Sequence, residues 1–181
     1  MSRNFNEIDI PKALQEVAEK TKYNVSAIQL NSEEMRPCYG CNGCWIKTPG
    51  ICVITNDCIN DISREYIQAD VVVLLSEITY GGFSTDIKVL IDRNISHALP
   101  FFTTHDSEMH HPKRYEHYPR RIAFGYGNVT EHEKKTFFEL ARRNTHGLPP
   151  ENLLTITVAN FDELQNALID FQAFLTRGTS I

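Results

Sequence analysis

Apolar residues recur at helical spacing in several stretches of the chain, and these stretches predict amphipathic helices. The first helix begins near Ile10, with Pro11 in its first turn, where a missing amide hydrogen costs little. Further helices are predicted at about residues 57–68, 84–95, 130–144 and 160–175. Thr130 and Glu133 have the spacing of a capping box at the start of one of them. In the first helix the positions expected to be buried are Ile10, Leu14, Val17 and Ala18.

Short apolar runs between these helices predict β-strands. Val71–Ser76 is apolar and rich in β-branched residues, as expected for a parallel strand that is covered on both faces. The other predicted strands are Asn24–Leu30, Ile122–Tyr126 and Leu153–Val158. Because strand and helix alternate, we expect the α/β class, with a doubly wound parallel sheet between two helix layers. We expect one domain over residues 1–181.

Residues 98–120 show no clear period and are rich in histidine, proline and aromatic residues. The segment is long for a connection in a compact domain, and such segments usually serve as lids or interface loops. Its histidines could bind a metal, an anion or a nicotinamide phosphate, and a solvated lid or a dimer contact is the alternative. The histidines in or next to the segment are His97, His105, His110, His111 and His117.

Charge and hydropathy exclude several classes of function. The net charge is −5, so no basic surplus points to nucleic acid or to an anionic membrane. The longest apolar run, Val71–Leu75, is far too short to span a bilayer, and the N-terminus shows no apolar signal segment. We therefore expect a cytoplasmic protein whose cysteines are reduced or bound to metal.

Four cysteines lie close together in a C-x2-C-x2-C-x7-C arrangement. Gly40 and Gly43 in the short spacers allow the backbone to curl tightly. This spacing is typical of cysteines that hold a 4Fe–4S cluster, with a four-thiolate zinc site, disulfides or metal-free loop cysteines as the alternatives. The fifth cysteine, Cys58, is expected to be a core thiol. The predicted metal ligands are Cys38, Cys41, Cys44 and Cys52.

Two stretches resemble a known family. Pro37-Cys-x-x-Cys-x-x-Cys-Trp, followed by Gly50-x-Cys-Val-Ile and Asp57, resembles the iron–sulfur flavoproteins of the NAD(P)H-dependent FMN reductase group. Ala69–Arg93 is similar to the strand, flavin-contacting loop and following helix of that group. The resemblance extends roughly from Ile8 to Phe174 and implies a flavodoxin-like fold.

The resemblance also implies an FMN site at the ends of two strands and at a phosphate loop near the N-terminus. One loop would lie against the flavin ring and another would close its other side. The implied cofactor-binding residues are Ser2, Arg3, Asn4, Ile78, Thr79, Tyr80, Gly81, Gly82, Phe83, Gly125, Tyr126, Gly127 and Asn128. Flavodoxin-like sheets have five strands in the order 2-1-3-4-5. The first, central strand and most of the phosphate loop have no counterpart in this chain. A truncated chain, a substitute segment or the loss of flavin binding would each account for this difference.

The sequence thus leads to three functional hypotheses. The first is an FMN-dependent oxidoreductase or electron-transfer flavoprotein, with a 4Fe–4S cluster, that takes electrons from NAD(P)H or a reduced carrier. The second is a flavodoxin-like protein that has lost FMN and serves as a scaffold or metal-binding subunit. The third is an electron carrier that reacts only with protein partners. In the first, no side chain needs to act as acid or base. The resemblance also implies a homo-oligomer and a small-molecule or protein redox partner.

Overall fold

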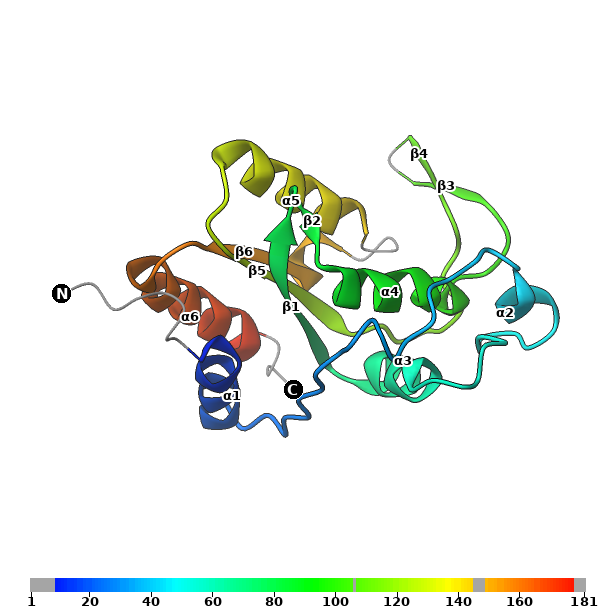
Figure 1. The fold of residues 1–181 in the computed structure, drawn as a ribbon, viewed down its shortest axis with the longest axis horizontal. Helices are drawn as coiled ribbons and strands as arrows, with labels where there is room; N and C mark the ends of the chain where they lie inside the picture. The colour runs from blue at the N-terminus through cyan, green and yellow to red at the C-terminus, as the bar shows by residue number, and fades with distance from the viewer. Residues whose placement is uncertain (1–8, 106, 145–148, 178–181) are drawn as a thin grey trace.

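The structure is a computed structural model that describes residues 9–105, 107–144 and 149–177. Three parallel strands form its sheet, namely β1 (Val71–Thr79), β5 (Arg120–Tyr126) and β6 (Leu153–Val158). The short strand β2 (Gly82–Phe83) pairs antiparallel with the end of β1, so the order is β2-β1-β5-β6 (Figure 1). Ile122 and Phe124 of the central strand β5 are completely buried. The strands predicted at residues 71–76, 122–126 and 153–158 are therefore confirmed.

Helices cover both faces of the sheet (Figure 1). On one face, α1 (Ile10–Lys20) and α6 (Phe161–Thr176) pack against β5 and β6 in the first of two hydrophobic clusters. On the other face, α3 (Ile59–Gln68), α4 (Thr85–Arg93) and α5 (Glu131–Arg143) form the second cluster. This is the three-layer, doubly wound α/β arrangement expected from the sequence. The remaining elements are α2 (Gly43–Ile46), the 3₁₀ turns η2 (Asn94–His97) and η3 (Pro150–Asn152), and the hairpin strands β3 (Thr103–His105) and β4 (Glu108–His110).

Local signals account for the helix starts. Asp9 caps α1 through a hydrogen bond from the Lys12 amide to Oδ1 (3.0 Å). Thr130 and Glu133 form the predicted capping box at the start of α5. Asn160 accepts a hydrogen bond from the Glu163 amide (2.9 Å) at the start of α6. These helices therefore begin where the sequence predicted.

The strand predicted at Asn24–Leu30 is wrong, because this stretch forms no strand in the structure. Val25 and Leu30 pack against the two hydrophobic clusters, so the alternating pattern reflects burial. A strand also needs a neighbour for its backbone, and β1 pairs with β5 over Val71–Glu77 and with β2 only at Ile78 and Thr79. No strand within the described ranges lines the other edge of β1 at residues 71–77. This open edge is where the family's first strand would lie.

Three smaller expectations also need correction. The flavin-contacting loop expected at residues 78–83 is a β-hairpin, in which Tyr80 (φ 51°) and Gly81 (φ 78°) occupy the two positions of a type I′ turn. The segment at residues 98–120 is not wholly irregular, because it contains the β3–β4 hairpin. Cys58 is exposed and so is not a core thiol. In the part of the chain that the structure describes, no helix is long and apolar enough to cross a membrane.

Candidate functional site

The cysteine loop, residues 36–57, carries all four cysteines of the motif on a largely irregular segment whose one helical turn is α2. The backbone adopts left-handed conformations at Gly40 (φ 70°), Asn42 (φ 55°) and Gly50 (φ 89°), which turn the chain back on itself. Gly43 is needed for a different reason, because a Cβ atom there would lie 2.5 Å from Cγ1 of Val53. Gly40 therefore has the predicted turning role, whereas Gly43 permits close packing.

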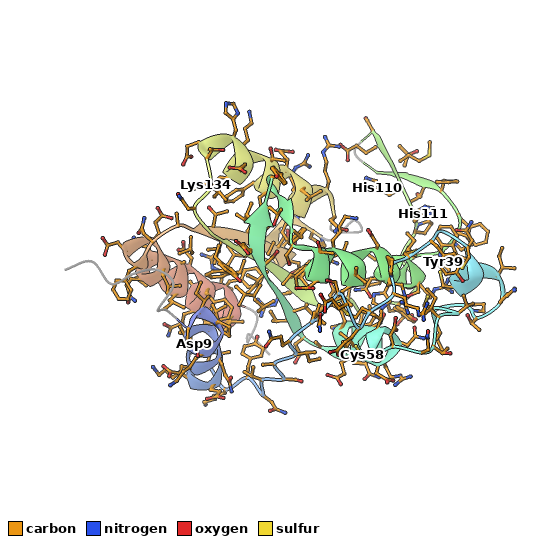
Figure 2. All side chains as sticks on the ribbon, in the orientation of Figure 1. Asp9, Tyr39, Cys58, His110, His111 and Lys134 are labelled. Carbon is orange, nitrogen blue, oxygen red and sulfur yellow. The ribbon has the colours of Figure 1, made fainter. Side chains whose placement is uncertain are left out.

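The four cysteines of the motif line a single cavity of about 400 Å³. Cys44 and Cys52 are buried, whereas Cys38 and Cys41 are exposed. Cys58 does not line this cavity, and Figure 2 shows it apart from Tyr39 of the cysteine loop. The structure therefore brings together the cysteines that the spacing grouped and leaves out the fifth. The other lining residues are Tyr39, Gly40, Asn42, Ile54, Ile91, Asp92, Arg93, Ile95 and Asn144.

Side chains of other elements hold the cysteine loop by its backbone. Asn60 of α3 accepts a hydrogen bond at Oδ1 from the Cys52 amide (3.1 Å), and its Nδ2 donates to the carbonyls of Cys52 and Ile54 (both 3.0 Å). The Nε1 atom of Trp45 donates to the carbonyl of Ala98 (3.0 Å), which ties α2 to the end of η2. The loop is thus fixed against α3 and η2.

A buried ion pair between Arg93 and Asp57 lies behind the loop. The two side chains are only 0% and 1% exposed, and the pairing is bidentate, with Nη1–Oδ2 at 2.8 Å and Nη2–Oδ1 at 3.2 Å. Burial raises the pKa of Asp57, but hydrogen bonds from Arg93 and from the amides of Arg36 and Ile59 outweigh it, so this pKa lies below its ordinary value. The sequence reasoning missed this pair. The available signal was an arginine on the inward side of an amphipathic helix and an aspartate five residues after Cys52.

The thiols of Cys41 and Cys44 differ in acidity. The Gly43 amide donates to Sγ of Cys41 (N···S 3.4 Å) and lowers the pKa of Cys41, and the Tyr39 hydroxyl and Lys47 lower it further. Burial raises the pKa of Cys44, and the neighbouring Cys52 raises it further. Because thiolates are the metal-binding form of cysteine, Cys41 is in this respect better prepared to bind a metal than Cys44.

The size of the cavity indicates what kind of group the thiols could hold. A water molecule takes up roughly 30 Å³ of liquid, so the cavity has room for a polynuclear group. Among the described residues, no three His, Cys, Asp or Glu side chains converge closely enough to bind one metal ion. In an iron–sulfur cluster each thiolate binds its own iron, so the sulfur atoms stand further apart than around a single zinc ion. Four thiolates on one cavity are a donor set that suits either an iron–sulfur cluster or zinc.

The first predicted flavin segment, residues 78–83, forms the β1–β2 hairpin. Ile78 and Phe83 are buried in the second hydrophobic cluster, and Thr79 pairs with Gly82 in the hairpin. Gly81 lies against α5, where a Cβ atom would come within 2.7 Å of Cβ of Thr136. Tyr80 at the tip is 92% exposed, so its ring is the group of this segment that can stack on a ligand.

The second predicted flavin segment, residues 125–128, follows β5 directly. Gly125 contributes to packing, since a Cβ atom there would lie 2.6 Å from Cδ1 of Ile78. Gly127 has φ 134°, and a Cβ atom there would meet nothing closer than Cγ of Glu77 at 3.8 Å, although its amide already donates to the carbonyl of Val158 (3.1 Å). Tyr126 is half-buried, and Asn128 is exposed. Tyr80, Tyr126 and Asn128 thus stay at least partly exposed at this edge.

The two flavin segments lie side by side, because Glu77 and Tyr126 are register partners at the ends of β1 and β5. The cysteine loop lies elsewhere, and Figure 1 shows α2 well separated from the tip of the β1–β2 hairpin. The structure therefore groups the predicted residues into two sites. The predicted phosphate contacts Ser2, Arg3 and Asn4 lie outside the described residues.

Three of the histidines in or next to the long segment have separate partners. The Nε2 atom of His97 lies 2.7 Å from Oγ of Ser63 in the interior. His111 contacts Trp45 and Phe102, with ring centroids 5.0 and 4.8 Å apart. The Nε2 atom of His117 lies 3.1 Å from the carbonyl oxygen of Ala69. His110 and His111 lie on the same side of the molecule as Tyr39 (Figure 2). The long segment therefore contacts α2 through His111.

The fold and the cysteine loop define a flavodoxin-like α/β protein with a four-cysteine site. The comparisons confirm the resemblance to the iron–sulfur flavoproteins. The chain is 35% identical over 85 residues to an iron–sulfur flavoprotein of Methanocaldococcus jannaschii, covering 47% of this chain and 42% of that protein. It is 26% identical over 80 residues to an iron–sulfur flavoprotein of Methanosarcina thermophila, covering 44% of this chain and 40% of that protein. The matches thus span less than half the length of these relatives.

The fold has a solved counterpart. The structure of an azoreductase from Bacillus anthracis superposes with a TM-score of 0.57, covering 97% of this chain and 91% of that chain at 11% sequence identity. This likeness shows the flavodoxin-like fold. No family model matches the chain.

Proposed function

We propose that this chain is an FMN-dependent oxidoreductase that carries a 4Fe–4S cluster on Cys38, Cys41, Cys44 and Cys52. The observation that carries the proposal is the single cavity around these four thiols. The two relatives are both iron–sulfur flavoproteins, which supports the same pair of cofactors.

The residues around the cavity have distinct roles in this proposal. The hydrogen bond from the Gly43 amide lowers the pKa of Cys41, which favours the thiolate form that binds metal. Cys44 and Cys52 hold the inner side of the cluster, where they are shielded from water. Asn60 fixes the backbone of Cys52. When bound, the cluster supplies one-electron transfer, and the protein contributes ligand positions and electrostatic tuning.

The flavin is proposed to bind at the edge formed by the ends of β1 and β5. Ligands of open α/β sheets bind at the carboxyl ends of the strands. There Tyr80 offers an exposed ring and Asn128 an exposed polar group. FMN supplies both one- and two-electron chemistry, so it can accept electrons from NAD(P)H and pass them on singly.

Anaerobic purification followed by an absorption spectrum and assays of iron, sulfide and flavin tests this function. We expect flavin bands and close to one iron atom per motif cysteine in the wild type. Cys41→Ser should lose the iron, whereas Cys58→Ser, a control at an exposed cysteine outside the cavity, should retain it. Iron that survives Cys41→Ser would contradict the cluster, and absence of flavin would contradict the oxidoreductase.

A second candidate is a flavodoxin-like scaffold that retains the metal but not FMN. It is favoured by the packing roles of Ile78, Phe83 and Gly125, which are engaged within the protein. Titration of the purified protein with FMN separates the two candidates. Tight binding that Tyr80→Ala weakens supports the flavin site, whereas no binding supports the scaffold.

We also propose that the chain forms a homo-oligomer through the surface around the cysteine loop. Large apolar side chains are exposed there on the cysteine loop and on or beside the β3–β4 hairpin, and such surfaces usually contact another protein. They are Tyr39, Ile46, Phe101, Phe102 and Met109. Light scattering should show an oligomer that Phe102→Glu dissociates, and a monomeric wild type would contradict the proposal.

A further inference from the structure

Arg93 bonds to both ends of the cysteine loop at once. Its Nη1 atom donates to the carbonyl of Arg36 (2.8 Å), two residues before Cys38. Its Nη2 atom donates to the carbonyl of Ile54 (3.0 Å), two residues after Cys52. A single guanidinium group therefore holds together the chain segments that precede and follow the four thiols.

Asp57 completes the closure from the same side. Its carboxylate accepts two hydrogen bonds from Arg93, one from the Arg36 amide (3.0 Å) and one from the Ile59 amide (3.2 Å). The carboxylate thus connects the start of the loop to the start of α3. Both charged groups are shielded from water, so solvent does not compete for these bonds.

We propose that Arg93, paired with Asp57, is the positioning residue that closes the cysteine loop and sets the spacing of its four thiols. This inference rests on one part of the proposed function, namely that the four thiols hold a cluster. Lysine cannot replace arginine here, because a lysine ammonium lacks the planar fork that meets two carbonyls and a bidentate carboxylate together.

The position of Arg93 also links the two sites. It is the last residue of α4, and α4 begins two residues after Phe83, the end of the hairpin at the proposed flavin edge. Asp86 in the first turn of this helix accepts a hydrogen bond from the Ser32 amide (2.7 Å). Helix α4 therefore connects the hairpin, which directly precedes it in the chain, to the cysteine loop that Arg93 holds at its other end.

The test compares the wild type with Arg93→Lys and with the neutral double variant Arg93→Met/Asp57→Leu. Lys88→Met, at an exposed pair on the same helix, is the matched control. Far-ultraviolet circular dichroism first establishes that each variant is folded. After anaerobic reconstitution we expect Arg93→Lys and the double variant to bind iron about tenfold more weakly, and the control to match the wild type.

A second readout needs no cluster. In the metal-free protein we expect iodoacetamide to label Cys44 and Cys52 about tenfold faster in Arg93→Lys than in the wild type, because the loop opens locally. Labelling of Cys58 should not change. A merely structural role would lower overall stability without this selective labelling. Unchanged iron binding together with unchanged labelling of Cys44 and Cys52 overturns the proposal.

Failure of the proposed function can be distinguished from failure of this inference. A wild type that binds no iron defeats the cluster, while the labelling experiment still decides the role of Arg93. Hydrogen exchange on the wild type covers the case in which the variants fail to fold. The amides of Arg36 and Ile59, which donate to Asp57, should then exchange as slowly as those of β5, and exchange at loop rates overturns the proposal.

Discussion

The cysteine loop is irregular but held in place by many hydrogen bonds, whereas strand β1 is regular but, within the described residues, unpaired along most of one edge. The loop is largely irregular, yet the side chains of Arg93, Asp57 and Asn60 hold its backbone through hydrogen bonds, and its own Trp45 donates to the carbonyl of Ala98. Strand β1 is a regular nine-residue strand, yet β2 covers only its last two residues on one edge. In this protein, the cysteine site is held in place by side-chain hydrogen bonds and not by backbone pairing in the sheet.

This difference shows what backbone pairing and buried side-chain hydrogen bonds each require. A strand needs a neighbour along its whole length, so a sheet edge stays exposed to pairing wherever the neighbour is absent. A loop held by buried side chains needs no such neighbour, but it depends on a few residues. Loss of one of them should therefore have a larger effect in the loop than a comparable change elsewhere.

The largest effect is expected for Asp57→Ala, which leaves the Arg93 guanidinium buried without a counter-charge. We expect the free energy of unfolding to fall by about 3–5 kcal/mol in urea titrations at pH 7. Asp61→Ala removes an exposed ion pair with Arg64 (3.0 Å) and should cost less than about 1 kcal/mol. Equal losses in the two variants would show that the buried network does not stabilise the loop.

A comparable effect is expected at His97, in η2 beneath α2. Burial lowers the pKa of His97 to about 4, with the charges of Arg121 and Arg114 acting in the same direction against the hydrogen bond with Ser63. The unfolded chain binds this proton near pH 6.5 while the folded protein stays neutral, so stability should fall as the pH drops from about 6.5 to about 4. The total loss is roughly 3 kcal/mol.

Urea titrations at several pH values in this window measure the effect of His97. In His97→Asn the decrease in stability with falling pH should be smaller by this amount. The same pH dependence in the variant and the wild type would assign the effect to other groups.

A smaller loss is expected for Gly43→Ala, because the added Cβ atom would lie 2.5 Å from Cγ1 of Val53. Overpacking of this kind should lower the free energy of unfolding by about 1–3 kcal/mol. The double variant Gly43→Ala/Val53→Ala removes the colliding methyl groups and should lose less than the sum of the two single variants. Strict additivity in thermal unfolding would contradict this packing role.

The smallest expected effect concerns strand β1, and measuring it needs no substitution. Hydrogen exchange should be faster at the amides of residues 71–77 that face the open edge of β1 than in β5, which is paired on both sides. Uniformly slow exchange along β1 would show that a further segment pairs with this edge. The result would also indicate whether the position of the family's first strand is filled.

The fold was largely predictable because its signals are local. Helix spacing, the Thr130–Glu133 capping box and the apolar run at Val71 each depend on neighbouring residues. The exception, Asn24–Leu30, fails because a strand also depends on a distant partner. The grouping of the four cysteines was likewise predictable from their spacing, whereas the Arg93–Asp57 pair was not, since 36 positions separate its members. The packing role of Gly125 was hidden for the same reason.

Trp45 gives the cysteine loop an optical signal of its own. It is the single tryptophan of the chain, it follows Cys44 directly, and its indole ring is fixed by the carbonyl of Ala98 and by His111. Its emission therefore reports on this one region without any label. A light-absorbing group held by the neighbouring thiols would quench that emission, so loading and loss of such a group can be followed in real time in the unmodified protein.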